Sequence, residues 1–159
     1  MTNYFSKRIS IEQVEEGTEL APKFDSNGII PVVTTDHKTG DVLMMGYMNN
    51  EALELTISSG EAHYFSRSRN AVWHKGATSG LVQKIKQILI DDDQDCVWLR
   101  VDVLGSGASC HVGYRSCFYR SVPFGKELKS NQLKLSFIES EKVFDPKLVY
   151  GNTPNPTKL

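Results

Sequence analysis

Two alternating stretches between positions 83 and 103 constrain the fold more than any other feature of the sequence. In Gln83–Ile90, Lys84 and Lys86 alternate with apolar positions, and Val97–Val103 alternates again. A period of two is typical of β-strands that bury one face. We therefore predict two strands, the first of which ends at a run of aspartates.

Turn and cap residues predict most of the other elements. Ser10–Gln13 fits a capping box that begins a short helix over 11–16. The main helix is expected at 50–59, because Asn49 can cap it, apolar residues recur at helical spacing and Gly60 can end it. We also predict a hairpin of strands 29–35 and 42–48, and a short strand that begins at His63 and runs into a basic segment ending at Arg69. Further strands are expected at 117–120 and 133–138, loops at 73–80 and 104–109, and an extended tail at 154–159.

Length and composition restrict the function. A chain of 159 residues has the size of one domain, and its net charge of −1 argues against binding nucleic acid or anionic membranes through bulk charge. No stretch resembles a signal peptide or a membrane-spanning segment. Three cysteines cannot all be paired, so we expect a cytoplasmic protein whose cysteines are metal ligands or buried residues.

Four aspartates fill five positions: Asp91, Asp92, Asp93 and Asp95. On an extended strand, Asp91, Asp93 and Asp95 would share one face, and Asp92 would point to the other. Three carboxylates on one face can converge on a hard cation such as Mg²⁺. The alternative is a solvated acidic turn, which is common between strands.

Softer ligands lie further along the chain. Cys110 and Cys117 are separated by six residues, and Gly113 between them would let the chain turn and bring the sulfurs together. The candidates for a third ligand are Cys96, Asp92 and His111. A site with three protein ligands leaves a fourth position for water, which is the catalytic pattern. Alternatively, the cysteines are core residues.

Basic and hydroxyl-bearing side chains flank both clusters. Any one of them is most simply a solvated surface residue. Together they supply guanidinium forks, hydroxyl donors and glycine-flanked N–H groups, which binding of two phosphate groups requires. Trp73 and Tyr64 can stack on a base or belong to the core. The group comprises Arg67, Arg69, Lys75, Lys84, Arg115 and Arg120 with Ser66, Ser68, Thr78 and Ser79.

Five ordered motifs resemble those of phosphoribosyl-AMP cyclohydrolase, an enzyme of histidine biosynthesis. They are Tyr64–Arg69, Trp73–Gly80, Gln83–Lys86, the alternation of Asp91, Asp93 and Asp95, and Cys110–Tyr119. The resemblance covers the stretch from about Gly28 to Arg120 and leaves 121–159 as a C-terminal extension. It implies hydrolysis of the N1–C6 bond in the adenine ring of 1-(5-phosphoribosyl)-AMP. It also implies a homodimer whose active sites use residues of both subunits.

The resemblance further implies two cofactors and a set of site residues. Zn²⁺ would be bound by Cys110 and Cys117, and Mg²⁺ by Asp91, Asp93 and Asp95. A zinc-activated water would attack the ring. The expected catalytic residues are His111, Lys75 and Arg115, and the expected substrate-binding residues are Arg67, Ser68, Arg69, Trp73, Thr78 and Ser79.

Three departures from the family pattern affect these expectations. The family usually has a third zinc cysteine between the first two aspartates, where this chain has Asp92. Either Asp92 replaces that thiolate or Cys96 does, and we prefer Asp92 because zinc accepts an oxygen ligand at ~2.0–2.2 Å without a shift of the chain. Ala77 stands where the family commonly has glutamate, and the length after Arg120 leads us to expect no pyrophosphohydrolase domain.

The sequence thus predicts a single α+β domain over residues 1–159, sheet-rich and barrel-like, with one main helix at 50–59. It would work as a dimeric Zn²⁺/Mg²⁺ cyclohydrolase. Two alternatives stay open. One is a related metal-dependent hydrolase or deaminase acting on another purine nucleotide, if Asp92 and Ala77 mark a changed pocket. The other is a noncatalytic binding protein stabilised by zinc.

Overall fold

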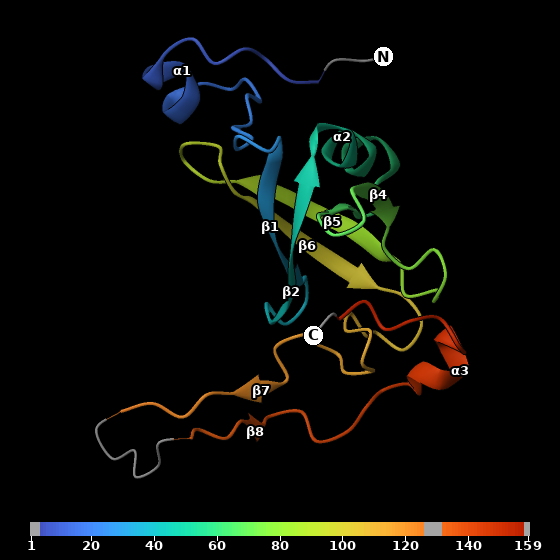
Figure 1. Cartoon of the computed structure of the whole chain (residues 1–159). Helices are drawn as coiled ribbons and strands as arrows, with labels where there is room; N and C mark the ends of the chain where they lie inside the picture. The colour runs from blue at the N-terminus through green and yellow to red at the C-terminus, as the bar shows by residue number, and fades with distance from the viewer. Residues whose placement is uncertain (1–3, 126–131, 158–159) are drawn as a thin grey trace.

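A four-stranded sheet forms the centre of the chain in the computed structural model, which describes residues 4–125 and 132–157 (Figure 1). The strand order is β2-β1-β6-β5, with β1 and β6 parallel and the two outer pairs antiparallel. The strands are β1 Ile29–Asp36, β2 Val42–Asn49, β5 Gln83–Ile90 and β6 Val97–Val103. All four were predicted from the sequence, and the sheet-rich α+β class is confirmed.

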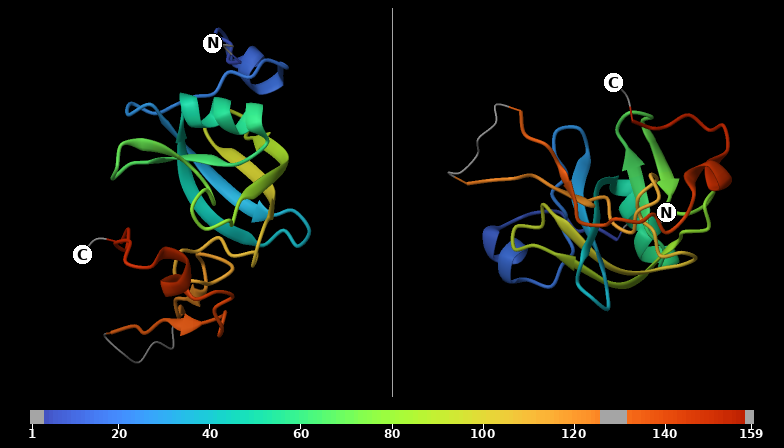
Figure 2. Two further views of the ribbon diagram at one scale, coloured as in Figure 1. Left: turned by 90° about the vertical axis from the view of Figure 1, so that its right-hand side faces the viewer. Right: turned by 90° about the horizontal axis from the view of Figure 1, so that it is seen from below.

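The sheet is open, with β2 and β5 as its edges. No closed barrel is formed by the strands in the described ranges, so the barrel-like form expected from the sequence is not present. Helix α2 (Asn50–Ser59) and the hairpin of β3 (His63–Ser66) and β4 (Ala71–His74) cover one face (Figure 2). The core lies between these layers and includes Ile30, Val32, Leu43, Leu53 and Leu99.

The caps of both N-terminal helices follow the sequence closely. In α2, the Asn49 side chain accepts a hydrogen bond from the Ala52 N–H, and Gly60 ends the helix in the left-handed conformation at φ +69°. In α1 (Ile11–Glu16), Ser10 accepts from the Gln13 N–H as a capping box requires. The Gln13 side chain accepts from the Ile9 N–H, one residue before the position predicted.

The two candidate clusters lie beyond opposite ends of the central strands. The aspartate loop, residues 91–96, joins β5 to β6 on the side of the sheet where α1 lies (Figure 1). The thiol loop, residues 110–117, follows the other end of β6. Because β6 has 7 residues, its length alone separates the two ends by about 20 Å.

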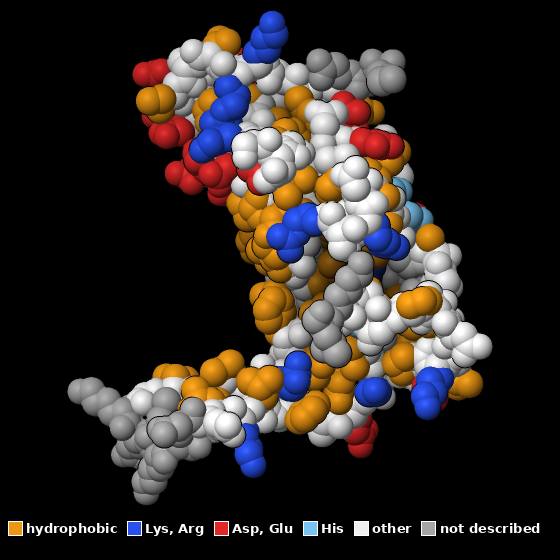
Figure 3. Space-filling model, viewed as in Figure 1, with side chains coloured by type: hydrophobic (Ala, Val, Ile, Leu, Met, Phe, Trp, Pro, Cys, Tyr) orange, Lys and Arg blue, Asp and Glu red, His pale blue; other side chains and the backbone are white. Residues whose placement is uncertain are grey.

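The C-terminal part differs most from the sequence prediction. The strands expected at 117–120 and 133–138 are reduced to the short pair β7 (Arg120–Ser121) and β8 (Ser136–Phe137), and helix α3 (Pro146–Tyr150) was not predicted. Residues 154–157 have no helix or strand, and the rest of the predicted tail lies outside the described residues. The space-filling view shows a hollow between this C-terminal part and the part of the molecule around α1 (Figure 3).

No helix in residues 4–125 and 132–157 is both long enough and apolar enough to cross a membrane.

Candidate active site

The aspartate loop gathers three carboxylates. Asp91, Asp93 and Asp95 each offer an oxygen, and these oxygens lie within 4.8 Å of one another. A turn brings them together, not the strand alternation expected from the sequence: Asp91 Oδ1 accepts from the N–H groups of Asp95 and Cys96, each at 2.9 Å. Oxygen ligands of Mg²⁺ lie up to about 4 Å apart, so a small inward movement of these side chains would fit the ion.

The N-terminal segment braces this loop through Gln94, which is buried and adopts φ +58°. Its Oε1 accepts from the Ala21 N–H at 2.8 Å, and its Nε2 donates to the carbonyls of Val14 and Glu19. The Lys23 ammonium lies 3.4 Å from an oxygen of Asp93 and 3.5 Å from an oxygen of Asp95. The N-terminal segment therefore fixes the aspartate loop through Gln94, and its Lys23 partly neutralises the negative charge of the aspartates.

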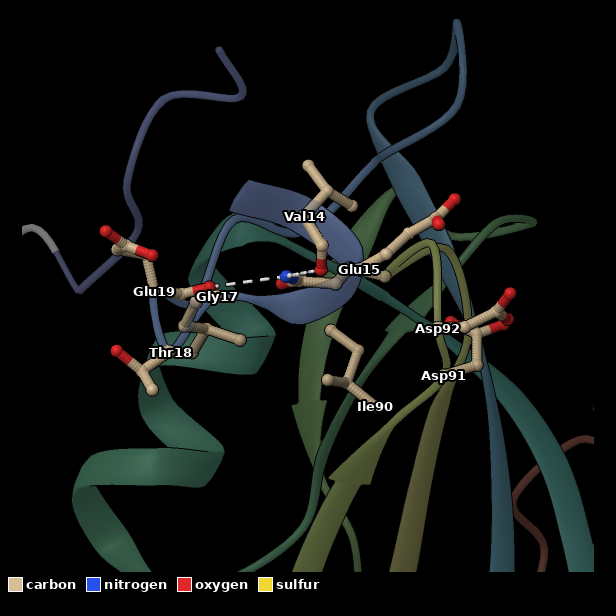
Figure 4. A pocket seen from close by; sticks show the side chains of 10 residues that line it. Val14, Glu15, Gly17, Thr18, Glu19, Ile90, Asp91 and Asp92 are labelled. Atoms are coloured by element: carbon tan, nitrogen blue, oxygen red, sulfur yellow. Dashed lines mark hydrogen bonds between the residues drawn. The ribbon is translucent and has the colours of Figure 1, made fainter. Parts of the chain in front are cut away.

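A pocket of about 340 Å³ lies between α1 and the aspartate loop (Figure 4). Ile90 contributes apolar surface to it, while Asp91 and Asp92 stand on one side. Asp92 is exposed. Its carboxylate is not in the group formed by the three other aspartates.

The thiol loop brings the side chains of Cys110 and Cys117 close enough together for each to change the pKa of the other. The turn between them depends on Gly113, which has φ +109° and whose N–H donates to the Cys110 carbonyl at 3.1 Å. The Cys117 N–H donates to the carbonyl of Leu43 at 2.7 Å and ties the loop to β2. Cys110 is buried, and Cys117 is exposed.

This contact separates the acidities of the two thiols. The hydrogen bond from Cys117 lowers the pKa of Cys110 from 9.0 to about 6, against the effect of burial and with help from the Val112 N–H and the charges of His111 and Lys75. The same interaction with Cys110 raises the pKa of Cys117. The pair of thiols thus holds one negative charge readily. A thiolate is the form of cysteine that binds zinc.

Two of the three residues expected to be catalytic adjoin these thiols. Lys75 is 8% exposed, burial lowers its pKa, and its Nζ donates to the carbonyl of Ser109 at 2.7 Å, next to Cys110. His111 lies inside the thiol loop. Its Nε2 is buried and has no hydrogen-bond partner in the described parts of the chain, so it can bond to a ligand.

Arg115, the third residue expected to be catalytic, lies among charged side chains. Its guanidinium donates to Asp41 Oδ2 at 2.9 Å and to Thr39 Oγ1 at 3.1 Å, and it lies 3.4 Å from Asp36 Oδ2. Arg115 therefore links the thiol loop to the turn between β1 and β2. Its guanidinium group is already engaged by side chains of that turn.

The residues expected to bind substrate divide into two groups. Arg67, Ser68 and Arg69 are exposed in the turn of the β3–β4 hairpin, where the Arg67 guanidinium lies 4.1 Å from the centre of the Tyr47 ring. Thr78 and Ser79 lie in the turn that follows β4. Strand β4, which is about 10 Å long, lies between the two groups in the chain.

Trp73 was expected in a loop, and the structure places it in β4. It pairs with Tyr64 on β3, and the two ring centres are 5.4 Å apart. The pairing of β3 with β4 and this ring contact keep Trp73 in a strand, although the residues that follow it are typical of a loop. Trp73 is half-buried, so one part of the ring stays accessible.

A buried polar chain beneath the thiol loop was missed from the sequence. The Tyr64 hydroxyl bonds to Thr34 Oγ1 and donates to Gln83 Oε1, both at 2.7 Å, and Gln83 Nε2 donates to Ser109 Oγ at 3.0 Å. Tyr64 is only 1% exposed, which places it in the core and not in a base-stacking position. The sequence feature that could have indicated this chain is Gln83, a polar residue at an inward-facing position of an alternating strand.

The aspartate loop and the thiol loop do not meet within one chain. In the described ranges, the three aspartates form the one group of three or more His, Cys, Asp or Glu residues with ligand atoms close enough to share an ion. Thus none of the three candidates for a third zinc ligand, Asp92, Cys96 and His111, forms such a group with Cys110 and Cys117 in the same chain.

Comparison with known proteins places the chain among the cyclohydrolases, hydrolases that open a ring. A family model described as phosphoribosyl-AMP cyclohydrolase matches residues 44–119. The protein of that name from Bradyrhizobium diazoefficiens is 51% identical over 87% of this chain and 94% of its own length. One from Rhodopseudomonas palustris is 49% identical over 92% and 94%, and one from Rhizobium etli is 47% identical over 87% and 89%. The chain belongs to the phosphoribosyl-AMP cyclohydrolase family.

Proposed function

We propose that the chain hydrolyses the N1–C6 bond of the adenine ring in phosphoribosyl-AMP, a step of histidine biosynthesis, as a homodimer that uses Zn²⁺ and Mg²⁺. Family membership supports the reaction and its substrate. The observation that carries the zinc chemistry is the pair of interacting thiols, Cys110 and Cys117, beside Lys75 and His111. In this reaction, the oxygen of water is added to C6, a proton is added to N1, and the ring opens.

The thiol loop fits zinc in its chemistry and its placement. Cys110 and Cys117 would hold the ion, which would supply the Lewis acidity that makes water nucleophilic near neutral pH. Lys75 holds the backbone at Ser109, and its buried charge favours thiolates. The unpaired Nε2 of His111 would accept and pass on a proton. Arg115 would act by fixing the loop, since its guanidinium is engaged by Asp36 and Asp41.

An uncovered apolar row supports the homodimer. Met45, Val33, Trp98 and Leu89 are neighbours in register across β2, β1, β6 and β5. Met45 is 44% exposed and Trp98 is 42% exposed. Met44, the neighbour of Met45 on β2, is buried in the core with Leu53 of α2, so the row that contains Met45 belongs to the opposite face of the sheet. Contiguous apolar surface of this kind is typical of an interface. We therefore propose that a second copy of the chain packs against this row.

Dimerisation would also bring the separated loops together. If two copies pack across this face in opposite directions, the aspartate loop of one copy reaches the thiol loop of the other, and two-fold symmetry forms the site twice. We propose Asp92 of the second copy as the third zinc ligand. Asp92 is exposed and free to reach outward, whereas Cys96 is half-buried with its thiol 3.9 Å from the carbonyl of Val97.

The reaction itself is tested with the purified chain. With Zn²⁺ and Mg²⁺ supplied, it should convert phosphoribosyl-AMP to the ring-opened formimino-carboxamide ribonucleotide, followed as a change in ultraviolet absorbance. Ammonia should not be released, because the amino nitrogen is retained. Release of ammonia would instead indicate the deaminase alternative, which Asp92 and Ala77 leave open. Absence of turnover would refute the proposed reaction.

The magnesium site gives a second prediction. Asp93→Asn should raise the Mg²⁺ concentration needed for half-maximal activity by at least about tenfold, because it removes one of three charged oxygen ligands. Zinc content, measured by elemental analysis, should not change. Glu51→Gln, which alters an exposed carboxylate on α2, is the matched control. An unchanged Mg²⁺ requirement in Asp93→Asn would refute this ligand assignment.

A further inference from the structure

The segment after β8 lies against the thiol loop, although it is outside the residues that the family model matches. The Val143 N–H donates to the carbonyl of Gly113 at 2.8 Å, and the Ile138 N–H donates to the carbonyl of Tyr119 at 2.9 Å. Gly113 has no room for a side chain, because a Cβ there would lie 2.7 Å from the carbonyl oxygen of Phe144. The segment thus follows the contour of the loop closely.

Glu139 makes the most specific of these contacts. Its Oε2 accepts from the Arg115 N–H at 2.9 Å, and its Oε1 accepts from the Ser116 N–H at 3.0 Å. Both donors lie between the two cysteines, and Ser116 directly precedes Cys117. Glu139 is half-buried, while Ile138 and Ser140 on either side are exposed. A carboxylate that accepts two backbone N–H groups makes charge-assisted bonds, which are about twice as strong as neutral ones.

The thiol loop does not use these two donors itself. Its internal bonds run from the Ser109 N–H to the carbonyl of Arg115 and from the Cys110 N–H to the carbonyl of Tyr114. These bonds fix the start of the loop, and Glu139 fixes the part that leads to Cys117. Without Glu139, the half-buried N–H groups of Arg115 and Ser116 would need other acceptors, and that part could shift.

An aromatic cluster holds Glu139 in position. Tyr114 and Tyr119 stack with ring centres 4.0 Å apart, and Phe137 on β8 lies 6.1 Å from the first and 5.9 Å from the second. Phe137 is two residues before Glu139. The segment that carries Glu139 is therefore held before this residue by the ring contacts of Phe137. After Glu139, it is held by the hydrogen bond from Val143 to Gly113.

We infer that Glu139 is a positioning residue for the reaction: its two hydrogen bonds to Arg115 and Ser116 hold Cys117 against Cys110 in the geometry that binds zinc. This role rests on the proposed zinc site and deepens it. Glu139 does not touch the thiols as a ligand. It acts through the backbone of the thiol loop, and it gives a function to a segment that carries none of the family motifs.

Glu139→Gln tests the inference in the full-length chain. The amide keeps the shape but has one acceptor oxygen, and its NH₂ group would face an N–H donor. We expect zinc affinity, measured by competition with a chromogenic chelator, to fall at least about tenfold, and kcat to fall with KM little changed. Amide hydrogen exchange at residues 115 and 116 should accelerate. Glu139→Asp, which keeps the charge with a shorter reach, should fall between Glu139→Gln and the wild type.

Glu141→Gln is the control, because it changes an exposed glutamate two residues away on the same segment. Faster exchange at 115 and 116 with unchanged zinc affinity in Glu139→Gln would overturn the inference while leaving the zinc site intact. The same loss in Glu141→Gln would overturn it too. A wild-type chain that binds no zinc would refute the proposed zinc chemistry, and the role of Glu139 with it.

Discussion

Replacing Cys110 or Cys117 with serine should remove zinc from the protein and lower kcat/KM by at least about 10³-fold. A serine hydroxyl stays protonated at neutral pH and is a poor replacement for a thiolate ligand. A loss of 10³-fold corresponds to about 4 kcal/mol of transition-state stabilisation, which is within the range that a Lewis-acid metal supplies. Elemental analysis of each purified variant and a steady-state assay measure the two effects.

Cys96→Ser is the matched control for this pair, since it makes the same chemical change in the third cysteine of the chain. It should keep both zinc and activity if Asp92 is the third ligand, and Asp92→Asn should then lose zinc. Zinc retained by both Cys110→Ser and Cys117→Ser would refute the thiol site. Loss in Cys96→Ser alone would refute the preference for Asp92. Circular dichroism distinguishes lost zinc from lost fold.

Two inactive variants should restore activity when they are mixed. Asp92→Asn damages the aspartate loop, and Cys110→Ser damages the thiol loop. If each site combines the loops of two copies, a mixed dimer contains one intact site and one doubly damaged site. With random exchange of subunits, half of the dimers are mixed and half of their sites are intact, so activity should recover to about a quarter of the wild-type value.

This recovery is the sharpest test of the shared site, because both parent variants start near zero. The mixture should be brought to equilibrium by slow dilution from mild denaturant, and each variant treated alone serves as the control. No recovery, together with demonstrated exchange of differently tagged subunits, would mean that the two loops act within one chain. The length of β6, about 20 Å, argues against that outcome.

The sequence predicted the regular centre of the fold well because those residues have a strong period and clear caps. Gln83–Ile90 alternates over 8 residues, and α2 has both Asn49 and Gly60 as boundaries. The C-terminal part could not be predicted in this way. The stretch at 133–138 has strand character, yet among the described residues it pairs only with the two-residue strand β7, so tertiary context limits the pairing to Ser136 and Phe137.

The sequence was enough to predict which residues are candidate ligands, because of their chemical types. It was not enough to predict how these residues are arranged in space. The aspartates and the two cysteines stand out as possible ligands in the sequence. That Asp91, Asp93 and Asp95 converge through a turn depends on Gln94 at positive φ, which single-residue preferences do not favour. Glu139 was missed because nothing in its neighbourhood distinguishes it from Glu141, and only the fold brings it to the backbone of residues 115 and 116.

The contacts of Gln94 have a practical consequence when joined with those of Glu139. A fragment trimmed to residues 44–119, the part that the family model matches, would contain every candidate metal ligand. It would lack Val14, Glu19 and Ala21, which hold the aspartate loop through Gln94, and it would lack Glu139. We therefore expect this fragment to be insufficient for activity, because residues near both ends of the chain support the two loops that hold the candidate ligands.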